Sequence, residues 1–436
     1  MQLHYKFILS IFFITTLNTF AQQKKIMPGA NRVSAYLPLL KGKRVAIFAN
    51  QTSVVGNTHL VDTLLALGIK VVVIFGPEHG FRGTADAGEK VNNKVDTKTK
   101  IPIISLYGSH KKPTPEDISN VDILLYDIQD VGIRFYTYIS SLEYYMEAAF
   151  ENRKELIILD RPNPNGYYVD GPVLEKEYKS FVGMQPIPIV YGLTVAEYAY
   201  MLAMQTYEGS TGIGLSINPS NIQIMIDGKP LQNTAIDYLV APKGGAFPFK
   251  LHLITCNNYT HASKYLLPVA PSPNLRLMQG IYCYPSTCFF EGTVLSEGRG
   301  TPTPFQLWGH PGYSNNKKLI TFTPQPNTGA KSSKLYGQLC YGWQIKGNTT
   351  QVLKTLNNQI QLSYLLNAYS LFTDKANFFI APTGANKDAY FFDKLAGNNT
   401  LRLQIIAGKS EADIKKSWQP KQEEYKAIRK KYLLYE

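Results

Sequence analysis

Residues 70–80 read KVVVIFGPEHG, and this stretch decides the fold. Its opening lysine is followed by five apolar residues, without the polar alternation of a strand that faces water on one side. Uninterrupted runs of this kind are typical of strands buried on both faces of a parallel sheet. Two glycines then enclose a proline, a glutamate and a histidine, which indicates a sharp turn where the strand ends.

Apolar runs of the same kind recur on both sides of this stretch. Apolar runs that predict strands lie at residues 43–49, 101–107, 121–126 and 155–159, and helical patterns lie between them at residues 59–67 and 136–151. Strands that alternate with helices predict an α/β fold with a doubly wound parallel sheet. The first strand is followed by Asn50-Gln51-Thr52-Ser53 instead of Gly-x-Gly-x-x-Gly. We therefore expect a Rossmann-like sheet without a dinucleotide motif and without a nucleotide cofactor.

The pattern changes after residue 191. Thr194, with Glu197 three residues later, predicts a capped helix over residues 194–205. Further expected elements are short strands at residues 222–226 and 287–294 and helices at residues 350–372 and 411–435. We expect a Rossmann-like catalytic domain over residues 22–190 and a smaller α+β domain over residues 191–436 that closes a cleft against it.

The N-terminus predicts export. Residues 1–21 combine Lys6, an apolar run over residues 7–17 and the small-residue end Thr19-Phe20-Ala21, as a cleavable secretory signal does. An apolar run of about eleven residues is too short to span a bilayer as a helix. We expect a secreted, periplasmic protein without stable membrane insertion.

Composition and charge narrow the function class. The 45 Lys and Arg outnumber the 32 Asp and Glu, for a formal charge of +13, yet charged residues make up only 18% of the chain and form no long runs. That pattern excludes a coiled coil and a basic tail for nucleic acid. Disulfides are possible in an oxidising compartment between Cys256, Cys283, Cys288 and Cys340, but no Cys-x-x-Cys or His-x-x-x-His spacing predicts a metal site. The chemistry must then come from carboxylates, histidines and hydroxyls.

Glu78 is the strongest candidate catalytic residue. The turn after its strand presents the carboxylate over the crevice that forms at the carboxyl ends of parallel strands. Partial burial there raises the pKa of a carboxyl, as a general acid at neutral pH requires. Glu78 can instead cap the following segment or pair with Arg82. Its neighbour His79 can orient a ligand or the backbone as readily as move a proton.

Polar residues that follow the other strands are expected at the same rim, because the carboxyl ends of parallel strands meet there. The candidate substrate-binding residues among them are Asn50, Asp127, Asp130, Arg134 and Tyr136. Arg134 can hold a substrate carboxylate through two parallel hydrogen bonds. Alternatively, it pairs internally with Asp127 or Asp130.

A second cluster lies far along the chain, after an aromatic-rich segment. It comprises Glu291, Glu297 and Arg299, and the glycines on either side of the arginine permit a close approach of the backbone to a ligand. These residues can close the cleft from the second domain, although Glu297 and Arg299 can equally satisfy each other. Residues 270–275 predict a structural loop near the same cleft.

Five motifs, taken in order, resemble the exo-β-N-acetylmuramidase family, formerly known as domain of unknown function 1343. They are GPEHG at residues 76–80, DIQDVG at 127–132, DRPNP at 160–164, APSPN at 270–274 and EGRGT at 297–301. The resemblance runs from about Lys41 to KYLLY at residues 431–435, nearly the whole mature chain. It implies a cleft between a Rossmann-like domain and a smaller domain, release of N-acetylmuramic acid from non-reducing ends of peptidoglycan fragments, and a catalytic role for Glu78.

Glycosidic cleavage needs a proton donor and a second group that stabilises or attacks an oxocarbenium-like centre. We expect Glu78 as the donor, and for the second role Asp127, Asp130, Glu291 and His79 remain open. The lactyl carboxylate of N-acetylmuramic acid calls for a cationic clamp, for which the candidates are Arg82, Arg134 and Arg299. The alternative function is a non-catalytic receptor for wall sugars. An esterase or amidase has little support because no Gly-x-Ser-x-Gly elbow precedes a helix.

Overall fold

A computed structural model describes residues 24–81, 94–208, 211–216, 222–231, 249–314, 316, 318–384 and 386–436. The expected secretory signal over residues 1–21 and the candidate clamp Arg82 lie outside the described residues. Among the described residues, no helix combines the length and the apolarity that crossing a bilayer requires.

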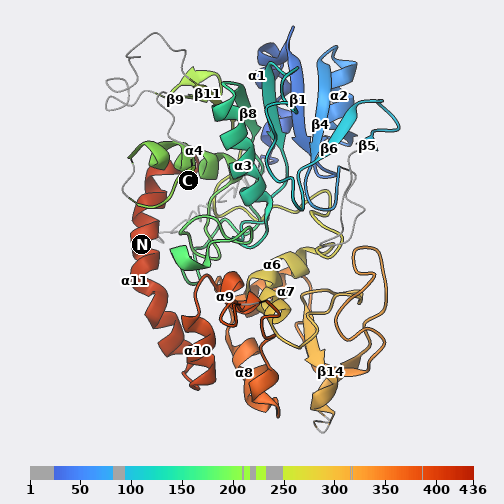
Figure 1. Ribbon diagram of the computed structural model, residues 1–436, viewed down its shortest axis with the longest axis vertical. Coiled ribbons are helices and arrows are strands. Elements are labelled where there is room, and N and C mark those ends of the chain that lie inside the picture. Colours follow the sequence, from blue (N-terminus) through green and yellow to red (C-terminus); the bar gives the residue numbers. More distant parts are fainter. Residues whose placement is uncertain are drawn as a thin grey trace, which may run out of the picture.

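A nine-stranded sheet forms the upper part of the molecule (Figure 1). Its strands, in their order across the sheet, are β10 (Lys229–Pro230), β9 (Ile222–Ile226), β11 (Phe249–Ile254), β8 (Glu155–Leu159), β7 (Ile123–Asp127), β1 (Arg44–Ala49), β4 (Lys70–Gly76), β6 (Pro102–Ser105) and β5 (Lys94–Val95). The edge strands β10 and β5 pair antiparallel, and every pairing between them is parallel. The predicted parallel sheet is confirmed.

Helices cover both faces of this sheet, as the doubly wound arrangement requires. Along β1, Ala46 and Phe48 point into one apolar cluster, while Val45, Ile47 and Ala49 point into another. The first cluster is completed by α3 (Tyr138–Glu151) and α4 (Val195–Glu208), and the second by α1 (Val33–Leu40) and α2 (Leu60–Ala66). Burial on both faces explains why the central strands read as continuous apolar runs.

The sheet extends beyond the boundary expected at residues 190 and 191. Strand β11 pairs in parallel with β8, with Leu251 opposite Leu156, and β9 pairs with β11. The expected boundary therefore divides one continuous sheet. Residues 222–226 were correctly expected to form a strand, but their separation in sequence from residue 159 hid the fact that they join the first sheet. The capped helix is also confirmed, because the Thr194 amide donates to Glu197 Oε2 at 2.8 Å.

The second part of the molecule is α+β, as expected (Figure 1). It holds an antiparallel sheet of order β12-β14-β13 (Leu307–His310, Cys340–Gln344 and Ile320–Phe322). Its helices are α6 (Met278–Thr287), α7 (Thr349–Leu356), α8 (Ser363–Leu371), α9 (Phe391–Ala396), α10 (Thr400–Ile406) and α11 (Glu411–Arg429). Shorter elements are the hairpin β2 and β3 (Val54–Val55, Thr58–His59) and six 3-10 turns: η1 (Gly29–Asn31), η2 (Lys176–Tyr178), η3 (Cys288–Gly292), η4 (Pro311–Tyr313), η5 (Lys375–Asn377) and η6 (Lys430–Tyr432).

Two predicted elements of this part are wrong. Residues 287–294 form the end of α6 and the turn η3 instead of a strand, because the aromatic run that suggested a strand is packed as a buried helical turn. The single helix expected over residues 350–372 is two helices. Asn357 and Asn358 both have positive φ and end α7, since asparagine tolerates the left-handed conformation.

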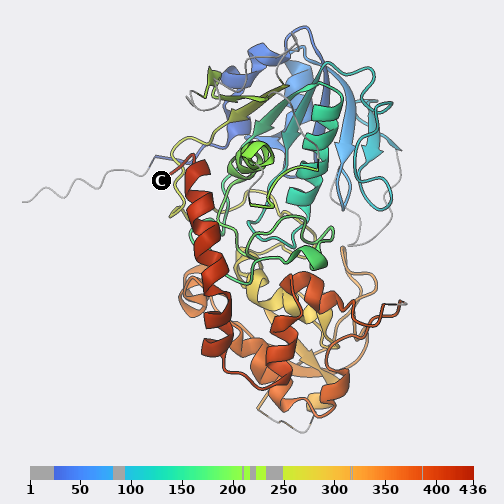
Figure 2. The same ribbon diagram turned by 60° about the vertical axis from the view of Figure 1, so that its left-hand side comes forward.

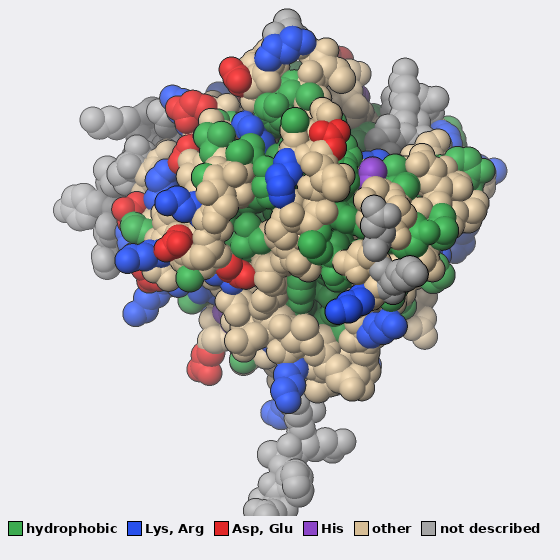
Figure 3. Space-filling view, turned by 90° about the horizontal axis from the view of Figure 1, so that it is seen from below, with side chains coloured by type: hydrophobic (Ala, Val, Ile, Leu, Met, Phe, Trp, Pro, Cys, Tyr) green, Lys and Arg blue, Asp and Glu red, His purple; other side chains and the backbone are tan. Residues whose placement is uncertain are grey.

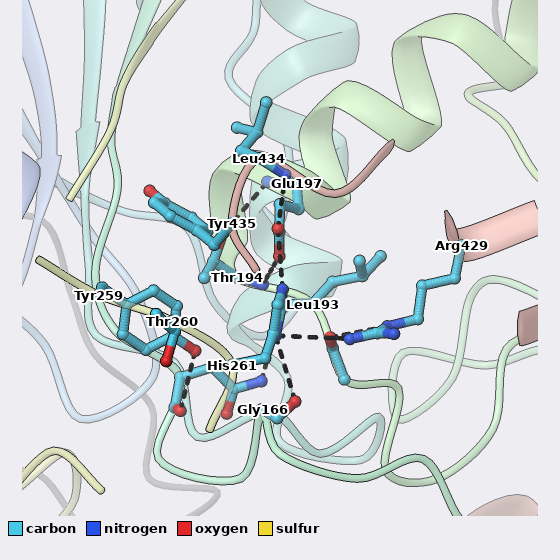
Figure 4. A network of polar contacts seen from close by, with 12 residues as sticks. Gly166, Leu193, Thr194, Glu197, Tyr259, Thr260, His261, Arg429, Leu434 and Tyr435 are labelled. Atoms are coloured by element: carbon cyan, nitrogen blue, oxygen red, sulfur yellow. Dashed lines mark hydrogen bonds and ion pairs between the residues drawn. The ribbon is translucent and has the colours of Figure 1, made fainter. Parts of the chain in front are cut away.

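Helix α11 joins the two parts. Figures 1 and 2 both show it running beside the second part and up to α4, so that the C-terminus lies near the first sheet. Figure 4 shows the contacts that fix this end: Glu197 Oε1 accepts from the Leu434 amide at 2.8 Å and contacts His261 Nε2 at 3.0 Å. The Tyr435 hydroxyl donates to Asp160 Oδ2 at 2.5 Å. The C-terminal residues therefore bind the second part to the first.

The surface of the second part carries mixed charges. Figure 3 shows Lys and Arg side chains lying among Asp and Glu side chains, with hydrophobic side chains between them. Ion pairs also join lysines of α11 to acidic side chains: Lys421 pairs with Glu175 and Lys426 with Glu423, both at 2.8 Å. The positive net charge is therefore not gathered into one patch on this face.

Candidate active site

A cleft of about 340 Å³ lies between the ends of strands β4, β6 and β7 and the second part. Its lining combines two glutamates, a histidine, an arginine and many aromatic rings. The lining residues are Glu78, His79, Tyr107, Phe135, Tyr136, Thr137, Tyr138, Phe181, Val182, Ser272, Asn274, Leu275, Tyr284, Glu291, Arg299, Phe305 and Phe391.

A tight turn presents Glu78 to this cleft. The Gly80 amide donates to the Pro77 carbonyl at 2.9 Å, and His79 has a φ of +69°, as the third residue of a type II turn requires. The Leu106 amide donates to the Gly76 carbonyl at 2.8 Å and ties this turn to the loop after β6. The sequence GPEHG thus folds into a turn that carries Glu78 beyond the edge of the sheet.

Glu78 is half-buried and lines the cleft. Its Oε1 accepts a hydrogen bond from the Tyr107 hydroxyl at 3.0 Å. His79 is buried and lines the same cleft. The carboxylate therefore has a defined orientation and open space in front of it, which proton transfer to a bound ligand requires.

Arg299 and Glu291 face this cleft from the second part. Arg299 Nη2 lies 2.7 Å from Glu291 Oε1, and its Nε lies 3.3 Å from Glu297 Oε1. Lys334 Nζ approaches the other oxygen of Glu297 at 2.9 Å. The expected pairing of Glu297 with Arg299 is present, but it is one link of a four-residue cluster, and Glu297 lies behind Arg299 instead of in the cleft lining.

The charges of this cluster stabilise one another. Burial alone would lower the pKa of Arg299, but the carboxylates of Glu291 and Glu297 raise it above its ordinary value. Burial would likewise raise the pKa of Glu297, but Lys334 and Arg299 hold it below the usual range. Arg299 is therefore a permanent cation, and its Nη1 makes no hydrogen bond with any described residue.

An aromatic floor connects the Glu78 side of the cleft to the Arg299 side. Burial and then the charge of Glu78 raise the pKa of Tyr138, which places this tyrosine near the glutamate. Tyr138 packs edge-to-face on Tyr136, which meets Tyr284, and Tyr284 packs on Phe305. The Arg299 guanidinium then lies 5.1 Å from the centre of the Phe305 ring. Tyr136 is thus in the cleft as expected, with its hydroxyl donating to the Pro271 carbonyl at 2.8 Å.

Arg134 does not lie in the cleft, so its interpretation as a substrate clamp is corrected. Its guanidinium donates to the carbonyls of Pro172, Ile187, Leu395 and Ala396 at 2.6–2.9 Å. It is fully buried without a carboxylate partner among the described residues, and burial lowers its pKa to about 9. A guanidinium remains protonated at neutral pH, so Arg134 is a buried cation held by carbonyl dipoles. It pairs with neither Asp127 nor Asp130.

The structure also places Asp127, Asp130 and Asn50 away from the cleft lining. Asp127 is fully buried and accepts from Arg161 at 2.5 and 2.8 Å. Asp130 accepts from the Tyr191 hydroxyl and the Gly132 amide, each at 2.5 Å, and burial raises its pKa to about 7. Asn50 Oδ1 accepts from the amide and hydroxyl of Thr52. These three side chains hold loops through internal contacts and do not line the cleft.

Several lining residues were not among the predicted site residues. Tyr107 is the last residue of the strand predicted over residues 101–107, and this position at the expected rim of the sheet could have marked it as a candidate. The loop over residues 270–275 was expected near the cleft, and its Ser272 and Asn274 do line it. Phe181 and Phe391 carry no motif, and only the folded chain brings them together.

The remaining chemical groups of interest lie elsewhere. All four cysteines are buried and unpaired, so the disulfides considered from the sequence are not formed. In the part of the chain that the structure describes, no three His, Cys, Asp or Glu side chains come together as a metal site.

Comparisons with known proteins agree along nearly the whole chain. Residues 45–279 match the family model described as exo-beta-N-acetylmuramidase NamZ, N-terminal, and residues 282–435 match its C-terminal counterpart. The peptidoglycan beta-N-acetylmuramidase NamZ of Bacillus subtilis is 36% identical over 96% of this chain and 93% of its own.

Two solved structures from Bacteroides fragilis, both titled DUF1343 family protein, share the fold. One is 40% identical, with a TM-score of 0.76 over 95% of this chain and 99% of the other. The second is 27% identical, with a TM-score of 0.71 over 94% and 99% of the two chains.

Proposed function

Since the chain belongs to the exo-β-N-acetylmuramidase family and is therefore a glycoside hydrolase of peptidoglycan, we propose that it releases N-acetylmuramic acid from non-reducing ends of peptidoglycan fragments. The observation that carries the proposal is the half-buried Glu78 in a cleft that Arg299 and Glu291 close from the other side. A carboxyl group, a second carboxylate and a cation are the groups that cleavage of an anionic sugar needs.

Glu78 acts as the general acid in this proposal. It donates its proton to the glycosidic oxygen as the bond to the sugar breaks, so that the leaving group departs as a neutral hydroxyl. The Tyr107 hydroxyl, 3.0 Å from Glu78 Oε1, holds the carboxyl in one orientation. A fixed donor matters because proton transfer requires hydrogen-bond distance to the leaving oxygen.

Glu291 is the second catalytic group that the geometry favours. Of the four candidates, Asp127 and Asp130 are sealed in internal contacts, whereas Glu291 and His79 line the cleft. Glu291 is the carboxylate of these two, and a carboxylate can either attack the anomeric carbon or activate water. The Arg299 guanidinium at 2.7 Å fixes its position.

Arg299 also takes the role of lactyl clamp. Its Nη2 and Nε contact Glu291 and Glu297, and its Nη1, which is not engaged by any described residue, leaves donors for the lactyl carboxylate. A neutral N-acetylglucosamine residue lacks the lactyl carboxylate and would leave this nitrogen without its anionic partner.

The location follows from the substrate and the N-terminus. Residues 1–21 have the pattern of a secretory signal, and peptidoglycan lies outside the cytoplasmic membrane. The enzyme is thus proposed to be secreted into the periplasm and to act on muropeptide-derived sugars in cell wall recycling.

The test is hydrolysis of a β-linked disaccharide of N-acetylmuramic acid and N-acetylglucosamine, whose sugar leaving group needs a proton to depart, by the parent, by Glu78→Gln and by the matched control Glu116→Gln on an exposed loop. We expect Glu78→Gln to lower kcat by at least about a hundredfold and the control to match the parent. A Glu78→Gln variant within a few-fold of the parent would remove Glu78 from the acid role. Binding of the muramide by the parent without release would indicate a receptor instead.

A parallel assay uses the corresponding N-acetylglucosaminide. We expect the parent to prefer the muramide by at least about tenfold, because one charge-assisted hydrogen bond contributes about 1.5–3 kcal/mol. Equal rates on the two substrates would argue against the lactyl clamp.

A further inference from the structure

Two phenylalanines at the mouth of the cleft have no role in the chemistry described so far. Phe391 opens helix α9 and is 38% exposed, the most exposed of the lining side chains. Phe181 and Val182, in a turn of the first part, are half-buried and belong to the same lining. By contrast, the rings of the floor, Tyr136 and Tyr284 among them, are buried.

We propose that Phe391, with Phe181 and Val182 in the same lining, is the binding platform for the neutral sugar on the leaving-group side of the scissile bond. This inference rests on the proposed function. An exo-acting hydrolase encloses the terminal sugar, so the leaving group must point to the mouth of the cleft. The cleft volume of about 340 Å³ is near the lower limit for small-ligand sites, so a longer saccharide must continue onto the rim.

The chemistry of Phe391 suits an uncharged sugar, whereas the Phe181 ring is stacked on Tyr144 and has Lys111 Nζ 4.5 Å from its centre. The C–H face of a pyranose ring is apolar, and an aromatic ring offers it a large, rigid surface. Phe391 is 38% exposed and lines the cleft, so part of its ring surface is available. A residue of N-acetylglucosamine, which has no carboxylate, fits this surface, while Arg299 serves the muramic acid residue on the other side of the bond.

The platform is built to keep its shape. Ser180 and Gly183 exchange two backbone hydrogen bonds of 2.9 Å around Phe181 and Val182. The buried Arg134 then ties the two ends of the loop that carries this segment to α9, since it donates to the carbonyls of Pro172 and Ile187 on one side and of Leu395 and Ala396 on the other. Fixed side chains lose little conformational entropy on binding, which favours affinity.

The arginine needs glycine at two neighbouring positions. A Cβ at Gly397 would lie 2.6 Å from Arg134 Nη2, and one at Gly183 would lie 3.3 Å from its Nε. The close approach of backbone to guanidinium is therefore part of how the two rim segments are joined. Arg134, which the sequence suggested as a substrate clamp, thus holds together the segments at the mouth of the cleft.

The experiment compares two substrates that differ only in the leaving group: a β-linked disaccharide of N-acetylmuramic acid and N-acetylglucosamine, and N-acetylmuramyl fluoride. We expect Phe391→Ala to lower kcat/KM about tenfold or more on the disaccharide and about twofold or less on the fluoride, which has no sugar to stack. Phe391→Trp should restore the disaccharide activity. Tyr336→Ala, a 55% exposed aromatic residue outside the cleft lining, is the matched control and should change neither rate.

Product inhibition gives an independent measurement. N-acetylglucosamine should inhibit Phe391→Ala about tenfold less strongly than the parent, while inhibition by N-acetylmuramic acid stays the same. Equal losses on the disaccharide and the fluoride, or an unchanged inhibition constant for N-acetylglucosamine, would overturn this inference alone. If the parent cleaves neither substrate, the proposed function falls and the inference falls with it.

Discussion

The carboxylates that follow the strands of this sheet fall into two groups with opposite environments. Asp127, Asp130 and Asp160 are sealed inside the protein, whereas Glu78 is presented to the cleft, where Glu291 of the second part also lies. All five lie in motifs or segments rich in polar residues and glycine. The comparison shows that a carboxylate at a strand end is not by itself a sign of catalysis.

Side-chain length and the turn that carries the carboxylate explain the difference. Asp127 is the last residue of β7 and Asp160 directly follows β8, so their short side chains stay within reach of loop amides and hydroxyls. Asp160, for example, accepts from the Ala196 amide at 3.0 Å and from the Tyr435 hydroxyl at 2.5 Å. Glu78 lies two residues beyond β4 on a turn and has a longer side chain. It therefore reaches past the edge of the sheet.

Among substitutions that distinguish the buried carboxylates from those in the cleft, Asp127→Asn is expected to have the largest effect. Asp127 and Arg161 form a fully buried pair with contacts of 2.5 and 2.8 Å. The substitution leaves the guanidinium without a charged partner, so the free energy of unfolding should fall by about 3–5 kcal/mol. Urea unfolding followed by circular dichroism measures this change.

The control for Asp127→Asn is Glu423→Gln, which breaks an exposed ion pair with Lys426. Its effect on unfolding should be about 0.5 kcal/mol or less. The folded fraction of Asp127→Asn should keep most of its kcat/KM below the melting temperature. A variant as stable as the parent but inactive would place Asp127 among the catalytic carboxylates and break the comparison.

The sequence predicted the framework of the fold because its signals are local. The apolar runs at β1, β4, β7 and β8 and the capping box at Thr194 each depend on a few neighbouring residues, and each is found where it was expected. Membership of β9 and β11 in the same sheet depends on pairing between residues about 100 positions apart, such as Leu156 with Leu251, and no local pattern records it.

The site was predictable only in part, for the same reason. Glu78, His79, Tyr136, Glu291 and Arg299 reach the cleft, although the strand expected around Glu291 is a helical turn. Arg134 was misassigned because its partners are backbone carbonyls at residues 172, 187, 395 and 396, which leave no trace in side-chain identity. Phe391 could not be predicted as a site residue, because an apolar residue at the start of a helix has the same sequence pattern whether it packs in the core or lines a cleft.

Glu291→Gln should lower activity and leave stability nearly unchanged, the opposite of what is expected for Asp127→Asn. If Glu291 is the second catalytic carboxylate, its neutral isostere should lower kcat by at least about a hundredfold, equivalent to about 2.7 kcal/mol in the transition state. Stability should change by about 1 kcal/mol or less, because Glu291 and Arg299 are both partly exposed. Steady-state kinetics on the muramide and thermal melting measure the two quantities. Unchanged kinetics would leave His79 as the remaining candidate for the second role.

The smallest effect is expected for Asp130→Asn, and it appears in the pH dependence of stability. Burial raises the pKa of Asp130 to about 7, whereas an unfolded aspartate titrates near about 3.9. The folded state therefore binds this proton more tightly. Its contribution to stability is fully present below about pH 4 and is lost as the pH rises to about 7.

Asparagine cannot titrate, yet its amide oxygen can still accept from the Tyr191 hydroxyl and the Gly132 amide. Between pH 5 and 8 the variant should consequently lose about 2.5 kcal/mol less stability than the parent, measured by urea unfolding at both values. Part of the slope should remain, because burial also raises the pKa of Asp160 to about 7. Identical slopes in the parent and the variant would mean that Asp130 does not keep its proton in the folded protein, and that its sealed environment is more polar than its contacts indicate.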